Sequence, residues 1–226
     1  MEQRQVRAKP EELSVCIGLP CGATLPWQTA LSLAATVRAC ALKGIPVEVA
    51  VIAGAAIVTE ARNQVVHAYL KTDCSRLFLI DSDMAWREDD FLRMLVLSEI
   101  MPVLCASYPR KRPDLRHTIK PLEGIEAPPN EFNCRQISGT GLGFTVMRRE
   151  VVEAVVAAAG SAYDEVQAEE IPDVFRVDTV ERRGRRTRRG EDMAFFADVM
   201  QAGYPIWYDP SVKLGHVGMH VFGGAA

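Results

Sequence analysis

The chain has 226 residues, of which 48% are hydrophobic and 24% are charged, and its formal net charge is −3. A chain of this length and apolar content can fill the core of one domain, so we predict a single domain. The small negative charge excludes a uniformly basic surface for nucleic acid or anionic membranes, but it allows local concentrations of charge. The longest apolar stretch, residues 47–58, is shorter than the roughly 20 residues that a membrane span needs, so we expect no span.

The cysteines and the first residues of the chain predict a cytoplasmic protein. The six cysteines include no C-x-x-C pair, so we expect reduced and mostly buried thiols. Residues 1–12 are polar and charged and lack the apolar core of a signal peptide. We expect this segment to be flexible.

The first half of the chain alternates between two kinds of pattern. Short apolar, β-rich runs predict strands at residues 13–19, 47–53, 76–80 and 103–107. Apolar residues at helical spacing predict helices at residues 27–42, 60–70 and 89–99. This alternation favours an α/β fold with a largely parallel sheet and helices on both faces. Ligands of such sheets bind beyond the carboxyl ends of the strands.

The second half of the chain is less regular. Five prolines and the lack of a period predict that residues 109–133 form an extended loop with a minor strand. The elements predicted after it are a strand with a glycine-rich opening (136–148), a helix (150–159), a strand (175–180), a basic loop (182–189), a helix (191–201) and a strand (206–208).

Two carboxylates follow the predicted buried strand of residues 76–80. Asp81 and Asp83, separated by Ser82, can face one divalent cation that also holds a diphosphate, because hard cations prefer oxygen ligands. Asp and Ser are also ordinary turn residues, so a simple surface turn is the alternative. The apolar run before Asp81 favours the metal site, since it puts the acids at the ligand-binding edge.

Two further candidates come from the last part of the chain. Glu191 and Asp192 begin a predicted helix, where the helix dipole keeps a carboxylate ionised, as a general base requires; helix capping explains the same pattern. His216 follows the last predicted strand and could complete a metal site with Asp83, or it could be structural. We expect the strand end, the helix start and the His216 loop to meet around one cavity.

Glycine and arginine residues suggest contacts with phosphate or with a ligand. The glycines Gly139, Gly141 and Gly143 favour a flat floor beneath a ligand over a phosphate-binding loop, and a bulged strand is the alternative. Arg62 opens a predicted helix and suits bidentate phosphate binding or a solvated face. Residues 182–189 contain six arginines, which suit a mobile loop paired with the preceding acidic run, a lid over a diphosphate or a nucleic-acid contact.

Taken in order, these residues resemble the GT-A fold nucleotide-sugar glycosyltransferases, especially the family-2-like group and its short phage and bacterial members. The matching segments are residues 15–20, 61–63, 79–83, 141–150, 190–192 and 216. The resemblance implies a Rossmann-like sheet within one domain of residues 1–226. It also implies a nucleotide-binding half at about residues 13–107 and an acceptor-side half at about residues 108–226.

The resemblance also implies an activity and roles for the site residues. The activity is metal-dependent transfer of a sugar from a nucleoside-diphosphate sugar, with UDP-sugar as the favoured donor and Mn²⁺ or Mg²⁺ as the metal. Asp192, beside Glu191, would be the base in an inverting displacement. The implied metal ligands are Asp81, Asp83 and His216, and the implied donor-binding residues are Pro20, Arg62, Asp81, Ser82, Asp83, Gly141 and Gly143.

The residues alone leave alternatives open. A nucleotidyltransferase that acts on a sugar phosphate also needs paired acids and a metal, and a retaining transferase cannot be told from an inverting one by sequence. A non-catalytic nucleic-acid module could be built around residues 182–189. The acceptor is also open, as a glycan, a protein or a modified nucleic acid, and the sequence gives no oligomeric state.

Overall fold

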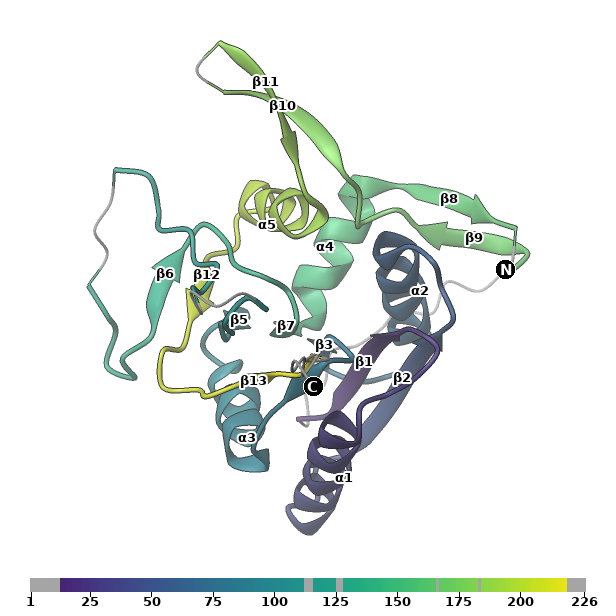
Figure 1. Ribbon diagram of the computed structural model, residues 1–226, viewed down its shortest axis with the longest axis vertical. Helices are drawn as coiled ribbons and strands as arrows, with labels where there is room; N and C mark the ends of the chain where they lie inside the picture. Colours follow the sequence, from purple (N-terminus) through teal and green to yellow (C-terminus); the bar gives the residue numbers. More distant parts are fainter. Residues whose placement is uncertain (1–12, 112–115, 125–127, 166, 183, 219–226) are drawn as a thin grey trace, which may run out of the picture.

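A seven-stranded sheet forms the centre of the computed structural model, which describes residues 13–111, 116–124, 128–165, 167–182 and 184–218 (Figure 1). Residues 1–12, which we expected to be flexible, lie outside the described residues. None of the helices in the described ranges has the length and apolar character to span a bilayer. The strands, in sheet order, are β2 (Val47–Ala53), β1 (Val15–Cys21), β3 (Arg76–Ile80), β7 (Phe144–Arg148), β5 (Val103–Cys105), β12 (Ile206–Tyr208) and β6 (Arg135–Ile137).

The sheet is mostly parallel. Strands β2, β1, β3, β5 and β12 run in one direction, because β7 is antiparallel to both β3 and β5, and β12 is parallel to β5. The two strands that run the other way are β7, inside the sheet, and β6, at one edge. The predicted α/β architecture is confirmed, and the carboxyl ends of β1, β3 and β5 meet at the same edge.

Helices cover both faces of the sheet (Figure 1). Alternate residues of a strand point to opposite faces, so Leu77 and Leu79 join one apolar cluster while Phe78 and Ile80 join the other. The first cluster is covered by α2 (Val58–Leu70), α4 (Arg149–Ala159) and α5 (Glu191–Gln201). The second is covered by α1 (Trp27–Leu42) and α3 (Glu88–Leu97).

A glycine in β1 determines how closely α2 approaches the sheet. A Cβ atom built on Gly18 would overlap Cγ1 of Val65, which is fully buried in α2. The helix therefore packs against the backbone of β1 itself. This packing brings the first turns of α2, with Arg62, towards the edge where β3 ends.

Two segments predicted as single elements are divided differently in the structure. Residues 136–148 contribute to two strands, β6 and β7, which are separated by the glycine-rich segment and pair with different partners: β6 with β12, and β7 with β3 and β5. Residues 182–189 are not a loop. They contribute β11 (Arg185–Arg189), which pairs with β10 (Asp178–Arg182), and Gly184, with φ of +70°, suits the tight turn between them.

Other exposed strands have no counterpart in the sequence prediction. A hairpin of β8 (Ser161–Asp164) and β9 (Glu169–Pro172) covers most of the acidic run at residues 164–173. The strand expected at residues 175–180 begins at Asp178. The described parts of residues 109–133 form the predicted extended loop, but they contain only isolated bridges in place of the predicted minor strand. All six cysteines are free and buried, as expected.

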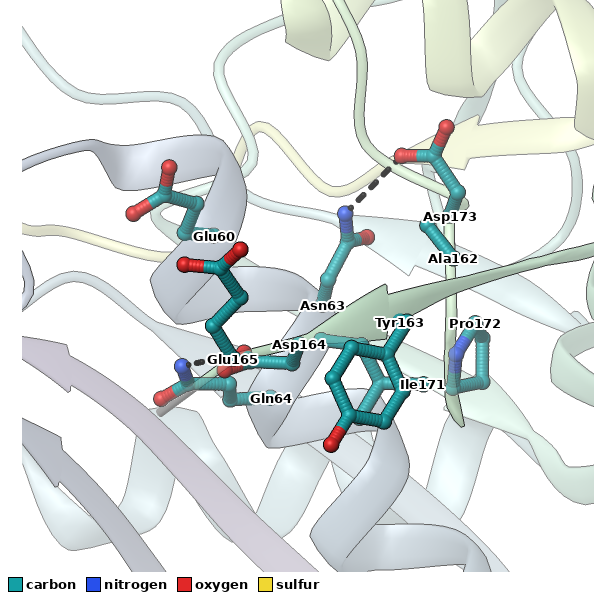
Figure 2. A pocket seen from close by; sticks show the side chains of 10 residues that line it. All are labelled: Glu60, Asn63, Gln64, Ala162, Tyr163, Asp164, Glu165, Ile171, Pro172 and Asp173. Atoms are coloured by element: carbon teal, nitrogen blue, oxygen red, sulfur yellow. Dashed lines mark hydrogen bonds between the residues drawn. The ribbon is translucent and has the colours of Figure 1, made fainter. Parts of the chain in front are cut away.

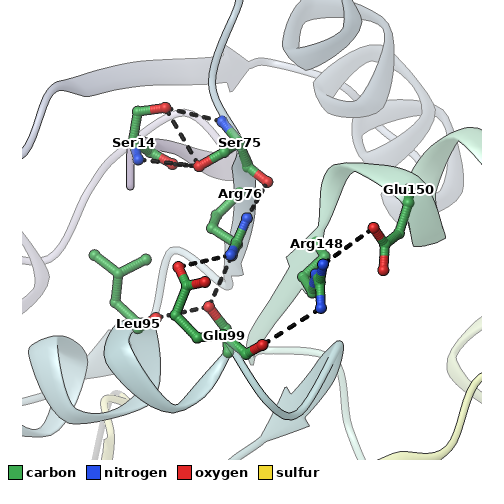
Figure 3. A network of polar contacts seen from close by, with 8 residues as sticks. Ser14, Ser75, Arg76, Leu95, Glu99, Arg148 and Glu150 are labelled. Carbon is green, nitrogen blue, oxygen red and sulfur yellow. Dashed lines mark hydrogen bonds and ion pairs between the residues drawn. The ribbon is translucent and has the colours of Figure 1, made fainter. Parts of the chain in front are cut away.

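A polar network closes the end of β3 opposite Asp81 (Figure 3). Arg76 is 1% exposed, and its guanidinium donates to Oγ of Ser98 (2.9 Å), to the carbonyl of Ser75 (2.9 Å) and to Oε1 of Glu99 (2.8 Å). Burying this charge is tolerated because its donors are paired. The network holds the amino end of β3, and with it the register that brings Asp81 to the opposite edge.

Candidate functional site

The turn after β3 brings His216 beside Asp83. The amide of Met84 donates to the carbonyl of Asp81 (3.1 Å), which closes a tight turn. Strand β4 (Met84–Ala85) then pairs with β13 (Gly215–His216), with His216 opposite Met84. The amide of Val217 donates to the carbonyl of Asp83 (2.7 Å). Backbone pairing therefore fixes the predicted contact between the strand end and the His216 loop.

Arg62 joins the strand end to the start of α5. Its side chain is 4% exposed; Nη2 lies 2.9 Å from Oδ1 of Asp81, and Nη1 lies 2.6 Å from Oδ1 of Asp192 and 3.5 Å from Oε1 of Glu191. Burial alone would lower the pKa of Arg62, but the carboxylates of Asp81 and Asp192 raise it, so the guanidinium is permanently charged. A cation thus occupies the space between the candidate donor-binding acid and the candidate base.

Asp192 is a stronger base than an ordinary aspartate. Burial raises its pKa, and the carboxylates of Glu191 and Asp81 add to that effect, while Arg62 opposes it. The N-cap of α5, Gly190, makes no side-chain cap hydrogen bond, and Glu191 and Asp192 lie in the first turn. The helix dipole and Arg62 both favour the ionised carboxylate there.

Asp83 and His216 share one region of space with Lys111. Nδ1 of His216 lies 2.8 Å from the carbonyl oxygen of Pro109, which can only accept, so Nδ1 carries the proton. In the neutral ring the lone pair of Nε2 then faces Oδ2 of Asp83, 3.4 Å away. Two electron-rich atoms in this arrangement need a cation nearby, and Nζ of Lys111 lies 2.5 Å from Oδ2 of Asp83.

The pair fits a divalent ion only if other groups complete its coordination. Within the described residues, no group of three or more His, Cys, Asp or Glu side chains could hold a metal. Asp83 supplies one carboxylate and His216 one imidazole. Nδ1 of the imidazole is hydrogen-bonded to a backbone carbonyl, as is usual for a histidine that binds metal through its other nitrogen. Asp81, by contrast, is engaged by Arg62. Its role as a metal ligand stays a prediction.

Tyr108 is a site residue that sequence reasoning missed. Its hydroxyl lies 3.4 Å from Oδ2 of Asp81 and accepts the amide hydrogen of Gly143 at 3.2 Å. Burial and the charge of Asp81 raise the pKa of Tyr108, so it remains a donor. Its ring meets that of His216 edge to face at 5.0 Å. A signal was available, since Tyr108 follows β5 at the same carboxyl edge as Asp81.

The predicted glycine floor lies directly against these side chains. A Cβ atom on Gly143 would lie 2.5 Å from Oδ2 of Asp81, and one on Gly141 would lie 2.5 Å from the hydroxyl of Tyr108. Any side chain at either position would displace the acid or the phenol. The role of this floor in binding a sugar stays a prediction.

Asn63 anchors the segment that leads towards the β10–β11 hairpin. Its Oδ1 accepts the amide hydrogens of Val174 (3.0 Å) and Phe175 (2.8 Å), and its amide group donates to Asp173. A cavity of about 370 Å³ lies beside it, between α2 and the β8–β9 hairpin (Figure 2). Its lining is acidic, and it does not include Asp81, Asp83, Asp192 or His216.

The remaining predicted donor-binding residues, Pro20 and Ser82, lie at the same edge. Pro20 is buried in β1 beyond Gly18, where the pairing of β1 with β3 has ended, so its missing N–H is tolerated. The carbonyl of Ser82 accepts the hydroxyl of Thr29 in α1 (3.0 Å). Their roles in donor binding stay predictions.

No protein-family model matches the chain, and no curated protein matches it. The chain is similar in structure to A197 from STIV, a viral protein, with a TM-score of 0.56 and 17% identity over 95% of this chain and 99% of that one.

Two glycosyltransferase structures are also similar. The structure of GalNAc-T7 with UDP, GalNAc and Mn²⁺ gives a TM-score of 0.54 and 9% identity, over 91% of this chain and 43% of that one. A mutant of the Drosophila β1,4-galactosyltransferase 7, complexed with manganese, UDP-Gal and xylobiose, gives 0.50 and 11% identity, over 92% of this chain and 72% of that one. The fold of this chain is therefore that of the GT-A glycosyltransferases.

Proposed function

We propose that the protein is a metal-dependent glycosyltransferase that moves a sugar from a nucleoside-diphosphate sugar to an acceptor hydroxyl. The observation that carries the proposal is the contiguous cluster in which Arg62 contacts Asp81 and Asp192 while His216 contacts Asp83, at the carboxyl edge of the sheet. The structures of GalNAc-T7 and β1,4-galactosyltransferase 7 contain manganese with UDP or UDP-Gal, which supports a UDP-sugar as donor here.

In this proposal Asp83 and His216 would hold the divalent ion, Mn²⁺ or Mg²⁺. When bound, the ion neutralises charge on the departing diphosphate. Lys111, now paired with Asp83, is released to contact a phosphate oxygen. Residues 13–107 chiefly bind the donor, and residues 108–226 face the acceptor.

Asp192 is the base of the proposed reaction. Its carboxylate takes the proton of the acceptor hydroxyl as that oxygen bonds to the anomeric carbon and the bond to the diphosphate breaks, with inversion. Arg62 holds Asp192 in place and keeps it ionised, whereas burial and the neighbouring Glu191 raise its proton affinity. These opposing influences suit a group that must be charged before the reaction and protonated after it.

The test is a thermal-unfolding panel of nucleoside diphosphates and nucleotide sugars, with and without Mn²⁺. A ligand at about 100 times its Kd should add about 2.7 kcal/mol of apparent stability. Asp83→Ala should remove the metal-dependent part of the shift, and Asp192→Asn should keep it. If no nucleotide sugar or nucleoside diphosphate shifts the wild type, the proposal is wrong. Release of pyrophosphate from a nucleoside triphosphate would indicate a nucleotidyltransferase instead.

A further inference from the structure

The β10–β11 hairpin carries its arginines away from the rest of the molecule. It extends beyond α5 as a separate two-stranded ribbon (Figure 1). The register places Asp178 opposite Arg189, Glu181 opposite Arg186 and Arg182 opposite Arg185. Side chains alternate between the faces of a strand, so one face carries Arg182, Arg185 and Arg189, and the other carries Arg186 and Arg188.

Among the described residues, most of this positive charge has no acidic partner. Asp178 pairs with Arg189. Arg182, Arg185, Arg186 and Arg188 are exposed and form no side-chain hydrogen bond or ion pair with any described residue. In sequence, residues 178–189 contain six arginines and two acidic residues, a formal charge of +4 in a chain whose net charge is −3.

The arrangement is unfavourable without a partner of opposite charge. Arg182 and Arg185 are directly opposite each other, and like charges in that position destabilise a hairpin. A cavity of about 390 Å³ opens beside Arg186 and Arg188 on the other face. Both faces therefore offer guanidinium groups whose donors are available to an external anion.

We infer that the hairpin binds the major groove of duplex DNA and so presents an acceptor hydroxyl, carried by a modified base of that DNA, to Asp192. The second part of the inference rests on the proposed function. The major groove is about 12 Å wide and admits a two-stranded ribbon with phosphates on both walls, whereas a flat anionic membrane would meet only one face. On each strand, residues two apart on one face are about 6.8 Å apart, close to two steps of a B-DNA strand.

The chain connects the hairpin directly to the candidate base. Only Gly190 separates Arg189, at the end of β11, from Glu191 and Asp192 in α5. A duplex held by the hairpin therefore lies next to the first turn of α5. Guanidinium groups suit this role, because their planar donors form bidentate contacts with phosphate and with guanine.

The test is fluorescence anisotropy of a labelled B-form duplex with the full chain over a salt series. Four available arginines predict a slope of log Kobs against log salt of about −3.6. The double variant Arg186→Gln with Arg188→Gln should reduce the slope by about 1.8. The matched control, Arg38→Gln with Lys43→Gln, removes two exposed charges from the α1 side and should leave the slope unchanged. Equal effects of both variants, or no duplex binding at low salt, would overturn the inference.

Binding measurements with other anionic ligands distinguish duplex DNA from a membrane surface and from RNA. Phosphatidylserine vesicles and an A-form RNA duplex should bind more weakly than B-form DNA, because a vesicle has no groove and the major groove of A-form RNA is too narrow for the hairpin. Vesicle binding as tight as duplex binding, lost in the same double variant, would assign the hairpin to a membrane surface and refute the inference.

Separate readouts distinguish this inference from the proposed function. Asp192→Asn should keep duplex binding, and the hairpin double variant should keep the Mn²⁺-dependent shift with nucleotide sugar. Loss of the nucleotide shift alone contradicts only the proposed function, and loss of duplex binding alone contradicts only the hairpin inference.

Discussion

At the scale of single residues, Arg62 is the positive charge around which the candidate site is arranged. It contacts Asp81, Glu191 and Asp192, and its side chain is nearly inaccessible to solvent. The two nearest acids remain about a quarter exposed. Water can therefore reach the carboxylates but not the guanidinium that holds them.

Replacing Arg62 should cost stability, because two partly buried acids lose their counter-charge. Removing one partner of a buried ion pair typically costs about 3–5 kcal/mol, and the exposure of the acids puts Arg62→Gln near the lower end. Urea unfolding at neutral pH measures the loss. Arg38→Gln, on the exposed side of α1, is the control and should change stability by less than about 0.5 kcal/mol. A similar loss in both variants would contradict the ion-pair account.

The rate of transfer should depend on the protonation of Asp192. Burial raises its pKa, so the base becomes protonated and kcat/KM falls at a higher pH than an ordinary aspartate would give. Because the Arg62 cation lowers this pKa, Arg62→Gln should move the acidic limb to still higher pH. A kcat/KM profile from acidic to neutral pH measures both effects. An unmoved limb in the variant would contradict the assigned role of Asp192.

Gly143 should tolerate no side chain. In Gly143→Ala the new Cβ would meet Oδ2 of Asp81 and the hydroxyl of Tyr108, so we expect a loss of about 1–3 kcal/mol and weaker donor binding. Thermal unfolding with and without nucleotide sugar measures both. Gly22→Ala is the matched control, since its Cβ would meet no atom within 4 Å. Normal donor binding in Gly143→Ala would show that Gly143 does not line the donor-binding site.

At the scale of elements, the contact between α2 and β1 determines where Arg62 lies. Gly18→Ala forces a methyl group against Val65 and should cost about 1–3 kcal/mol. Val65→Ala removes the opposing side chain, so the double variant should lose less stability than the sum of the single variants. Denaturant unfolding of all four proteins measures this coupling. Simple additivity would show that α2 does not rest on Gly18.

Elements with a strong apolar pattern could be predicted from the sequence. The bounds predicted for α1, β2, β3, α5 and β12 match the structure, because buried faces impose periods of 3.6 or 2 on the residues. The β8–β9 and β10–β11 hairpins were not recognised. Apart from the buried end of β9, their strands are largely exposed and rich in charge, so cross-strand backbone pairing, which leaves no apolar period, decides their structure.

Those residues of the candidate site that lie next to strongly patterned elements could be predicted from the sequence. Asp81 and Asp192 were predicted because they lie at the ends of strongly patterned elements. Tyr108 and Lys111 lie in the loop after β5, where no apolar period marks them, and only the position of Tyr108 shortly after a strand indicates the carboxyl edge. Arg62 was expected to face phosphate or solvent, whereas it binds carboxylates, and such pairing depends on tertiary contacts that sequence spacing does not reveal.

At the scale of the whole molecule, strands from the second half of the chain complete a sheet whose other strands, apart from β6, come from the first half. Strand β7 joins β3 to β5, and β12 joins β5 to β6. Asp209, directly after β12, is fully buried and pairs with Arg93 of α3 at 2.7 Å. Strand β12 and the residue that follows it therefore support both the sheet and one helical layer.

Removing residues 204–226 should prevent cooperative folding, because β5 and β6 lose their shared neighbour and Arg93 loses its partner. We expect the loss of near-ultraviolet circular dichroism and of a sharp thermal transition. Lys213→Ala, an exposed change in the same region, should retain both. A truncated chain with a native spectrum would show that β12 is dispensable.

The position of β12 also has a consequence for biosynthesis. Ile206, at the start of β12, comes 69 positions after Ile137 at the end of β6 (206 − 137 = 69), so a ribosome adding about 5–20 residues per second needs roughly 3–14 s to reach the missing strand. During that interval the nascent polypeptide exposes unpaired backbone along β5 and β6. Newly made molecules, more than mature ones, should therefore depend on chaperones and be prone to aggregation.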